Sequence, residues 1–149
     1  MTENIKASIK HEVSLSMKEG NKYRTITLRL IISAFQVEEI SKKEELNDKE
    51  CIEILEKMIK QRKDSISQFE SAGREELSKK EKDEIIIIQE FMPEQLSVEE
   101  IDVLVKKVIS ETNAESLKDM GKVMGMLKEL TSGKADAGYI SSEVKKALS

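Results

Sequence analysis

Residues 91–100 of the chain, FMPEQLSVEE, decide how it is divided, because they contain its only proline, Pro93. A proline disfavours the helical conformation in the residue before it, so a helix is expected to end by Met92. Ser97 and Glu100 have the spacing of a capping box, in which each side chain bonds the backbone amide of the other residue, so a new helix should begin after Ser97. We therefore predict two domains, residues 1–92 and residues 93–149, joined by a short linker.

The composition predicts a protein made only of helices. The 149 residues include one proline, no tryptophan and 3% aromatic residues, while charged residues make up 36% of the chain. A sequence that is poor in proline and glycine and rich in Lys, Glu, Ile and Leu is typical of helical proteins. We predict an all-α fold with an N-terminal four-helix bundle and a C-terminal three-helix unit.

In the first domain, apolar periodicity and stop signals predict four helices, at about residues 3–19, 22–40, 47–71 and 75–92. Gly20 and Gly73 are expected to end the first and third helices. The second helix should use the apolar stripe with helical spacing as its core face: Tyr23, Ile26, Leu30, Ala34 and Val37. Four isoleucines at 85–88 favour a strand by propensity. Their helix-forming flanks favour a helix, and an apolar run of this kind predicts deep burial.

The second domain contains two glycines one helical turn apart, within KDMGKVMG at residues 118–125 and followed by GKAD at 133–136. Ser116 and Asp119 form a further capping-box pattern, so a helix should begin there with free amides available to a phosphate. Gly121 and Gly125 would lie on one face of it, and each glycine costs a helix about 1 kcal/mol relative to alanine. Two explanations fit: close packing against another helix, or a backbone surface that receives a ligand such as RNA.

Charge is unevenly distributed in the second domain. The whole chain has a formal net charge of -4, so no overall attraction to nucleic acid or to acidic lipid is expected. Residues 94–117 contain two lysines and six acids, whereas residues 118–149 contain six lysines and four acids. The basic segment therefore coincides with the glycine-containing helix and the 133–136 turn, which makes this the segment where a phosphate would bind.

Nothing in the sequence predicts a membrane or secreted protein. The N-terminus opens a charged amphipathic segment instead of a signal peptide. The longest apolar run, residues 85–88, is too short to span a bilayer. We therefore predict a cytoplasmic protein with no membrane partner.

Candidate catalytic residues are few. The single histidine, His11, has no partner in the sequence, and the single cysteine, Cys51, lies near an expected helix start without an evident base. The sequence contains no phosphate loop, metal-ligand cluster or Ser-His-Asp arrangement. We predict no catalytic residue, no metal and no cofactor. The methionines at 120 and 124 share a helix face and fit either core packing or a protein-binding groove.

Several motifs together resemble the YqeY-like family, whose C-terminal half is similar to the tail of the GatB subunit of tRNA-dependent amidotransferases. They are RLIISAFQVEEI at residues 29–40, KQRKDSISQFESAGR at 60–74, FMPEQLSVEE at 91–100, and residues 118–138. One difference is Ala137, where amidotransferase tails commonly have proline. The resemblance covers nearly the whole chain and implies two helical bundles.

The resemblance also implies a function. In the amidotransferase the tail holds tRNA while the chemistry occurs on other domains, so this chain would be a non-catalytic accessory protein that binds tRNA or another structured RNA. The residues implied to meet RNA are Gly121, Lys122, Gly125, Gly133, Lys134, Ala135 and Asp136. An amidotransferase or an aminoacyl-tRNA synthetase would be its protein partner. Alternatives are a helical protein–protein interaction module and an auxiliary component of a carbon–nitrogen ligase that uses glutamine as its nitrogen donor.

Overall fold

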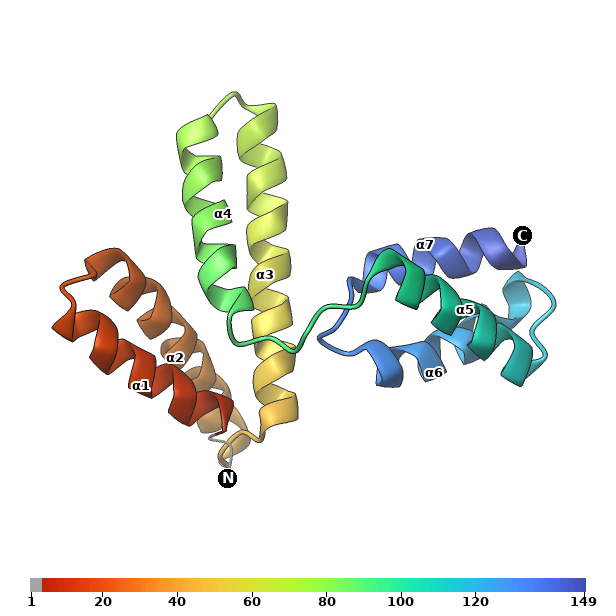
Figure 1. The fold of residues 1–149 in the computed structure, drawn as a ribbon, viewed down its shortest axis with the longest axis horizontal. Coiled ribbons are helices and arrows are strands. Elements are labelled where there is room, and N and C mark those ends of the chain that lie inside the picture. The colour runs from red at the N-terminus through yellow and green to blue at the C-terminus, as the bar shows by residue number, and fades with distance from the viewer. Residues whose placement is uncertain (1–3) are drawn as a thin grey trace. The chain divides into compact units, whose positions relative to one another are not determined.

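The computed structural model describes residues 4–149, and these residues form seven α-helices, one short 3-10 helix and no strand (Figure 1). The prediction of an all-α protein is confirmed. The start of the first helix, expected at Glu3, lies outside the described residues. The chain separates into two compact units, Met1–Met92 and Pro93–Ser149. Among the helices in the described part of the chain, none is both long and apolar enough to cross a membrane.

The first unit consists of two helical hairpins. Its helices are α1 (Ile5–Lys18), α2 (Lys22–Lys42), α3 (Asp48–Ser71) and α4 (Glu75–Gln89). Gly20 and Gly73 have φ angles of 72° and 70° in the two tight turns, a left-handed conformation that glycine adopts without steric cost. Each turn reverses the chain at once, so α1 packs on α2 and α3 packs on α4, as Figure 1 shows.

The core of the first unit takes side chains from all four of its helices. The fully buried apolar residues are Ile9, Leu28, Ile31, Phe35, Leu55 and Ile88. Residues 85–88 are helical, as predicted, but only part of this run is buried. Ile86 is exposed while its three neighbours are buried, because α4 turns one side to solvent. We expected every side chain of this helical turn to be buried, and the exposure of Ile86 shows that this expectation was wrong.

The predicted core face of α2 is also wrong. Tyr23, Ile26, Leu30 and Val37 are exposed, and the helix instead buries the opposite face, which carries Thr25, Thr27, Leu28, Ile31 and Phe35. Hydropathy hides this face because two of its residues are threonines.

Both threonine hydroxyls have hydrogen-bond partners, so their burial leaves no polar group unpaired. The hydroxyl of Thr25 lies 2.7 Å from that of Ser16 and donates to the carbonyl oxygen of Asn21 at 2.8 Å. The hydroxyl of Thr27 donates to the carbonyl oxygen of Tyr23 at 3.2 Å.

The second unit has its own core. It contains α5 (Val98–Thr112), the 3-10 helix η1 (Leu117–Asp119), α6 (Met120–Thr131) and α7 (Ala137–Leu148). Their buried apolar residues include Ile101, Val108, Val123, Leu127 and Val144. The capping boxes at Ser97–Glu100 and Ser116–Asp119 are both present. The second of them opens η1 and not α6 itself, which moves the α-helix start to Met120.

A matched pair of substitutions tests the orientation of α2. Ile31 is 0% exposed and Ile26 is 59% exposed, although the two isoleucines lie less than two turns apart on one helix. Ile31→Ala removes packed core atoms and should lower the unfolding free energy by about 2–5 kcal/mol. Ile26→Ala should change it by about 0.5 kcal/mol or less. Chemical denaturation followed by circular dichroism measures both, and equal losses would contradict the orientation described.

Candidate functional site

The two glycines of α6 lie on its solvent-exposed side. The helix buries Val123, Leu127 and Thr131, and the side chains of Met120 and Met124 pack against the same core. A Cβ atom added at Gly121 or at Gly125 would meet no other atom within 4 Å. Packing against another helix therefore does not account for these glycines within the described residues, and their backbone is open to a ligand.

The 133–136 turn is tied to the linker in front of α5. Gly133 is buried with a φ of 75°. Its carbonyl oxygen accepts from the side-chain amide of Gln95 at 2.8 Å. The carbonyl oxygen of Lys134 accepts from the amide of Leu96, also at 2.8 Å. These bonds hold the turn in one conformation.

The remaining residues of the turn differ in role. Ala135 is half-buried and packs against the core, while the carboxylate of Asp136 caps α7 by accepting from the amide of Gly138 at 3.3 Å. Lys134 is exposed, so it is the residue of this turn whose charge is available to a ligand.

The residues predicted to meet RNA do not line one pocket. They lie near the two ends of α6. Gly121 and Lys122 belong to the first turn of α6, and the 133–136 turn follows its last residue, Thr131. A helix of 12 residues is about 18 Å long. A ligand that touches both ends must therefore be an extended one, such as a nucleic-acid backbone or a protein surface.

The start of this helix offers fewer free amides than expected. The hydroxyl of Ser116 accepts from the amide of Lys118 at 3.3 Å. The carboxylate of Asp119 accepts from the amides of Glu115 and Ser116 at 2.9 and 3.4 Å, and these bonds lower its pKa. These three amides precede α6 and are already hydrogen-bonded, so they are not available to an anion.

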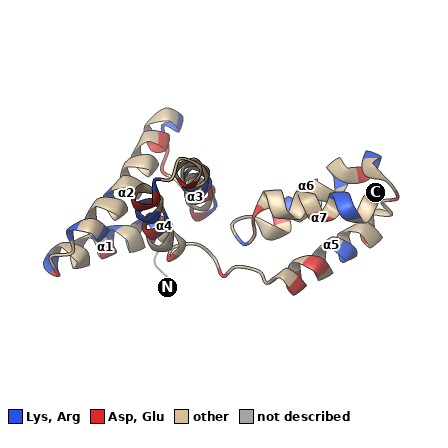
Figure 2. Cartoon of the chain, turned by 90° about the horizontal axis from the view of Figure 1, so that it is seen from above, with Lys and Arg blue, Asp and Glu red and all other residues tan. Residues whose placement is uncertain are grey.

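Acidic and basic side chains occupy different helix ends in the second unit. The first turn of α5 carries Glu99 and Glu100, whereas the last turn of α6 carries Lys128 and that of α7 carries Lys145 and Lys146 (Figure 2). Leu117, Met126 and Leu130 are exposed as well, but helical spacing places Met126 and Leu130 on a different side of α6 from the two glycines. The exposed part of α6 therefore offers bare backbone at its two glycines and the cations Lys122 and Lys128.

The candidate catalytic residues of the first unit form no reactive pair. Cys51 is buried, and burial raises the pKa of its thiol to about 11, so the thiol is protonated at neutral pH. His11 is exposed on α1. Among residues 4–149, no group of three or more His, Cys, Asp and Glu side chains is placed to hold a metal ion.

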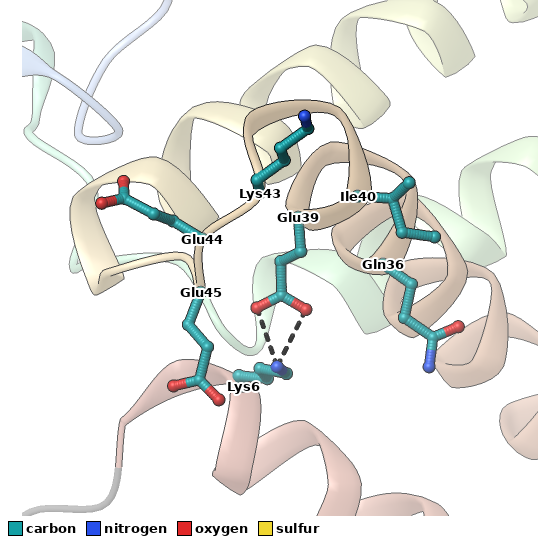
Figure 3. Close-up of a pocket in the computed structure, with 7 residues that line it drawn as sticks. All are labelled: Lys6, Gln36, Glu39, Ile40, Lys43, Glu44 and Glu45. Atoms are coloured by element: carbon teal, nitrogen blue, oxygen red, sulfur yellow. Dashed lines mark hydrogen bonds and ion pairs between the residues drawn. The ribbon is translucent and has the colours of Figure 1, made fainter.

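A hollow of about 520 Å³ lies where α1 meets the end of α2 (Figure 3). The ammonium group of Lys6 bonds both carboxylate oxygens of Glu39 there, at 2.9 and 2.8 Å. The same carboxylate accepts from the amide of Leu46 at 3.1 Å. Sequence reasoning missed this pair, because the two residues are 33 positions apart and neither has a local signal. Its contacts tie α1, α2 and the loop before α3 together, which is a structural role.

Comparison with known proteins identifies relatives that align with 63–95% of this chain. The family model described as Yqey-like protein matches residues 6–148. An uncharacterised protein of Schizosaccharomyces pombe is 34% identical over 94 residues, which cover 63% of this chain and 76% of that protein. Altered inheritance of mitochondria protein 41, mitochondrial, from Kluyveromyces lactis is 31% identical over 155 residues, covering 95% of this chain and 83% of the relative. The protein of the same name from Pyrenophora tritici-repentis is 29% identical over 136 residues, covering 89% of this chain and 75% of the relative.

These relatives correct one prediction and leave another open. The prediction of a cytoplasmic protein is contradicted, because the named relatives that align over most of this chain are mitochondrial proteins. The similarity to the GatB tail stays a prediction. The family itself is established by the match to nearly every residue, and the chain belongs to the YqeY-like family.

Proposed function

We propose that the outer side of α6 and the 133–136 turn bind structured RNA, and that the protein is a non-catalytic accessory factor. The observation that carries this proposal is the open backbone at Gly121 and Gly125, where no protein atom lies within reach of a Cβ. A sugar–phosphate backbone could approach this helix more closely than one that carries side chains on the same face. The resemblance to a tRNA-holding tail makes tRNA the preferred ligand.

Two lysines supply the charge for this surface. Lys122 lies beside the glycines and Lys134 lies in the turn, and both side chains are exposed. Neither forms an ion pair with any residue in the range 4–149. Lys122 also attracts the carboxylate of Asp119 and helps to lower its pKa, while both ammonium groups remain exposed to phosphates, which bind lysine as a point charge.

The expected affinity is low. Each neutralised phosphate contributes about 0.7–0.9 to the slope of log affinity against log salt, so two lysines give a slope of less than about 2. A surface of this kind needs a second contact, and an amidotransferase or an aminoacyl-tRNA synthetase that holds the same RNA would supply it.

A protein partner bound to α6 is the second candidate. Leu117, Met126 and Leu130 are exposed in η1 and α6 and would give an apolar contact to another protein. Such a partner depends on apolar area and little on the two lysines, whereas RNA depends on the lysines. Charge substitution therefore separates the two functions.

Substitution of both lysines tests RNA binding. Lys122→Glu with Lys134→Glu should weaken binding of an unmodified tRNA transcript about tenfold or more at low salt, because two attractive contacts become repulsive. Fluorescence anisotropy with labelled tRNA measures the change. Far-UV circular dichroism and the melting temperature should stay the same, since both side chains are exposed.

The control for this experiment changes net charge equally at another place. Lys106→Glu with Lys107→Glu alters exposed residues of α5 and should leave tRNA binding within about twofold of the wild type. RNA binding is refuted if the wild type binds no tRNA at low salt, or if both double variants bind like the wild type. The protein-partner function would then take first place.

The glycines themselves give an independent prediction. Gly125→Ala should raise the unfolding free energy by up to about 1 kcal/mol, because it improves helix propensity and the new methyl group meets no neighbour. Gly125→Leu should fold equally well but hold an RNA backbone away, so tRNA affinity should fall several-fold. Ser142→Leu, at an exposed position of α7, is the matched control and should not affect binding. A destabilised Gly125→Ala protein would show that the glycine has a packing role.

A further inference from the structure

A second hollow, of about 340 Å³, lies between α1 and α2, and its volume is within the range of small-molecule sites. We call it the α1–α2 hollow. Its lining combines two cations, two neutral hydrogen-bonding side chains and two apolar side chains, which are Lys10, Val13, Arg29, Ile32, Ser33 and Gln36. None of these residues is acidic, whereas the hollow described above has three glutamates in its lining. In a chain with a formal net charge of -4, the α1–α2 hollow is a local reversal of charge.

Helical spacing brings the polar residues of α2 to this hollow. Arg29, Ser33 and Gln36 are four and three residues apart, so they lie on one side of the helix. All three belong to the segment RLIISAFQVEEI, residues 29–40, to which the RNA proposal gives no role. The segment therefore presents a guanidinium group, a hydroxyl and an amide side by side, and each of them can donate a hydrogen bond.

The hollow has an apolar base. Val13 of α1 and Ile32 of α2 are half-buried and pack against the core of the first unit, whereas the four polar lining residues are exposed. Because the base belongs to a packed core, it does not have to become ordered when a ligand binds. A small molecule can therefore place an apolar part on this base while its polar part meets the exposed donors.

The two cations of the hollow have no acidic partner. Neither Lys10 nor Arg29 forms an ion pair with another residue between 4 and 149. The guanidinium group of Arg29 donates one hydrogen bond to the sulfur of Met17 at 3.4 Å, and a thioether is a weak acceptor. A guanidinium group has five N–H donors, so most of those on Arg29 remain available to a ligand.

The carboxylate of Glu39, one helical turn beyond Gln36, does not neutralise the hollow. It bonds the ammonium group of Lys6 at 2.9 and 2.8 Å (Figure 3). This bond is the main cause of the lowered pKa of Glu39, and Lys10 adds a weaker attraction. Lys6 and Glu39 thus compensate each other, and the two positive charges of Lys10 and Arg29 remain.

The charge and the donors of the hollow match a phosphate monoester. Such a group carries about 1.5–2 negative charges at pH 7 and has three strong acceptor oxygens. Arginine binds phosphate through two parallel hydrogen bonds, and lysine binds it as a point charge. A carboxylate brings one charge and two oxygens, so it would leave one of the two cations uncompensated. The apolar base adds a contact for the organic part of an ester.

We propose that the α1–α2 hollow binds the phosphate monoester group of a small organic molecule. Lys10 and Arg29 hold the phosphate, and the base formed by Val13 and Ile32 contacts the organic part. The site lies wholly in the first unit and uses none of the residues proposed to bind RNA. The variant with Lys122→Glu and Lys134→Glu should therefore bind this ligand like the wild type, and each proposal can fail without the other.

Three ligands provide the probe: phenyl phosphate, phenyl sulfate, which has the same shape but a single negative charge, and inorganic phosphate. In NMR titrations of the full-length protein at low salt, phenyl phosphate should shift the backbone amide signals of the lining residues. It should bind about threefold or more tightly than phenyl sulfate, because the additional charge meets two cations. Inorganic phosphate should bind more weakly than phenyl phosphate, since it has no group for the apolar base. Equal affinity for the two esters, inorganic phosphate binding as tightly as phenyl phosphate, or no shift at the lining residues would overturn the proposal.

Removal of the two cations tests their role. Lys10→Gln with Arg29→Gln should weaken binding of phenyl phosphate about tenfold or more, because both attractive charges are lost. The control, Lys57→Gln with Lys63→Gln, removes the same charge from exposed positions of α3 and should bind within about twofold of the wild type. Glutamine is a good helix former, so both variants should keep the helical content of the wild type in circular dichroism. Equal affinities of the two variants would contradict the assignment of the phosphate to this hollow.

Filling the hollow tests its shape separately from its charge. Ser33→Phe keeps both cations but places a ring at an exposed position of the lining, so binding of phenyl phosphate should weaken about tenfold. Ser33→Ala leaves the space open and should bind within about threefold of the wild type, because it removes at most one hydrogen bond. Unchanged binding by the Ser33→Phe variant would show that surface charge alone attracts the ligand, and it would overturn the proposal.

Discussion

The buried contact between the hydroxyl groups of Ser16 and Thr25, 2.7 Å long, is the constraint on which the arrangement of the first unit depends. Each hydroxyl also has a backbone carbonyl as partner, that of Val13 for Ser16 at 3.0 Å and that of Asn21 for Thr25 at 2.8 Å, so neither polar group is buried without a hydrogen bond. With that cost removed, α2 can turn Leu28, Ile31 and Phe35 inward, where they fill the core between the two hairpins. The other apolar face of the same helix, with Ile26, Leu30 and Val37, then remains exposed to solvent.

The second unit shows a similar relation between a helix and its surface. Its core needs only one side of α6, and Val123 and Leu127 occupy that side. Gly121 and Gly125 lower the stability of the helix without any compensating contact inside the unit. A small domain has a low free energy of unfolding, so a destabilising residue is a considerable cost to it. The simplest physical explanation of such glycines is a contact with another molecule, and this explanation underlies the RNA proposal.

Features that depend on neighbouring residues were predictable from the sequence. Gly20 and Gly73 adopted left-handed turns, because each conformation is set by one residue and its immediate neighbours, and α4 ended at Gln89, before Pro93. The orientation of α2 was not predictable in this way. It depends on threonines whose hydroxyls donate to carbonyl oxygens one turn back in the same helix, those of Asn21 and Tyr23, whereas a hydropathy pattern treats threonines as polar and therefore exposed.

The candidate site was predictable only in part, for the same reason. The positions of Gly121, Gly125 and Lys122 on one exposed helix follow from helical geometry, but the capping bonds of Asp119 and the role of Asp136 required the structure. The contacts of Gln95 and Leu96 with the 133–136 turn join residues 38 positions apart and left no signal in the sequence. These contacts have a functional consequence. Because the linker ahead of α5 is bonded to the turn that carries Lys134, displacement of the linker would also displace that lysine, so the geometry of the proposed RNA surface depends on the linker as well as on α6.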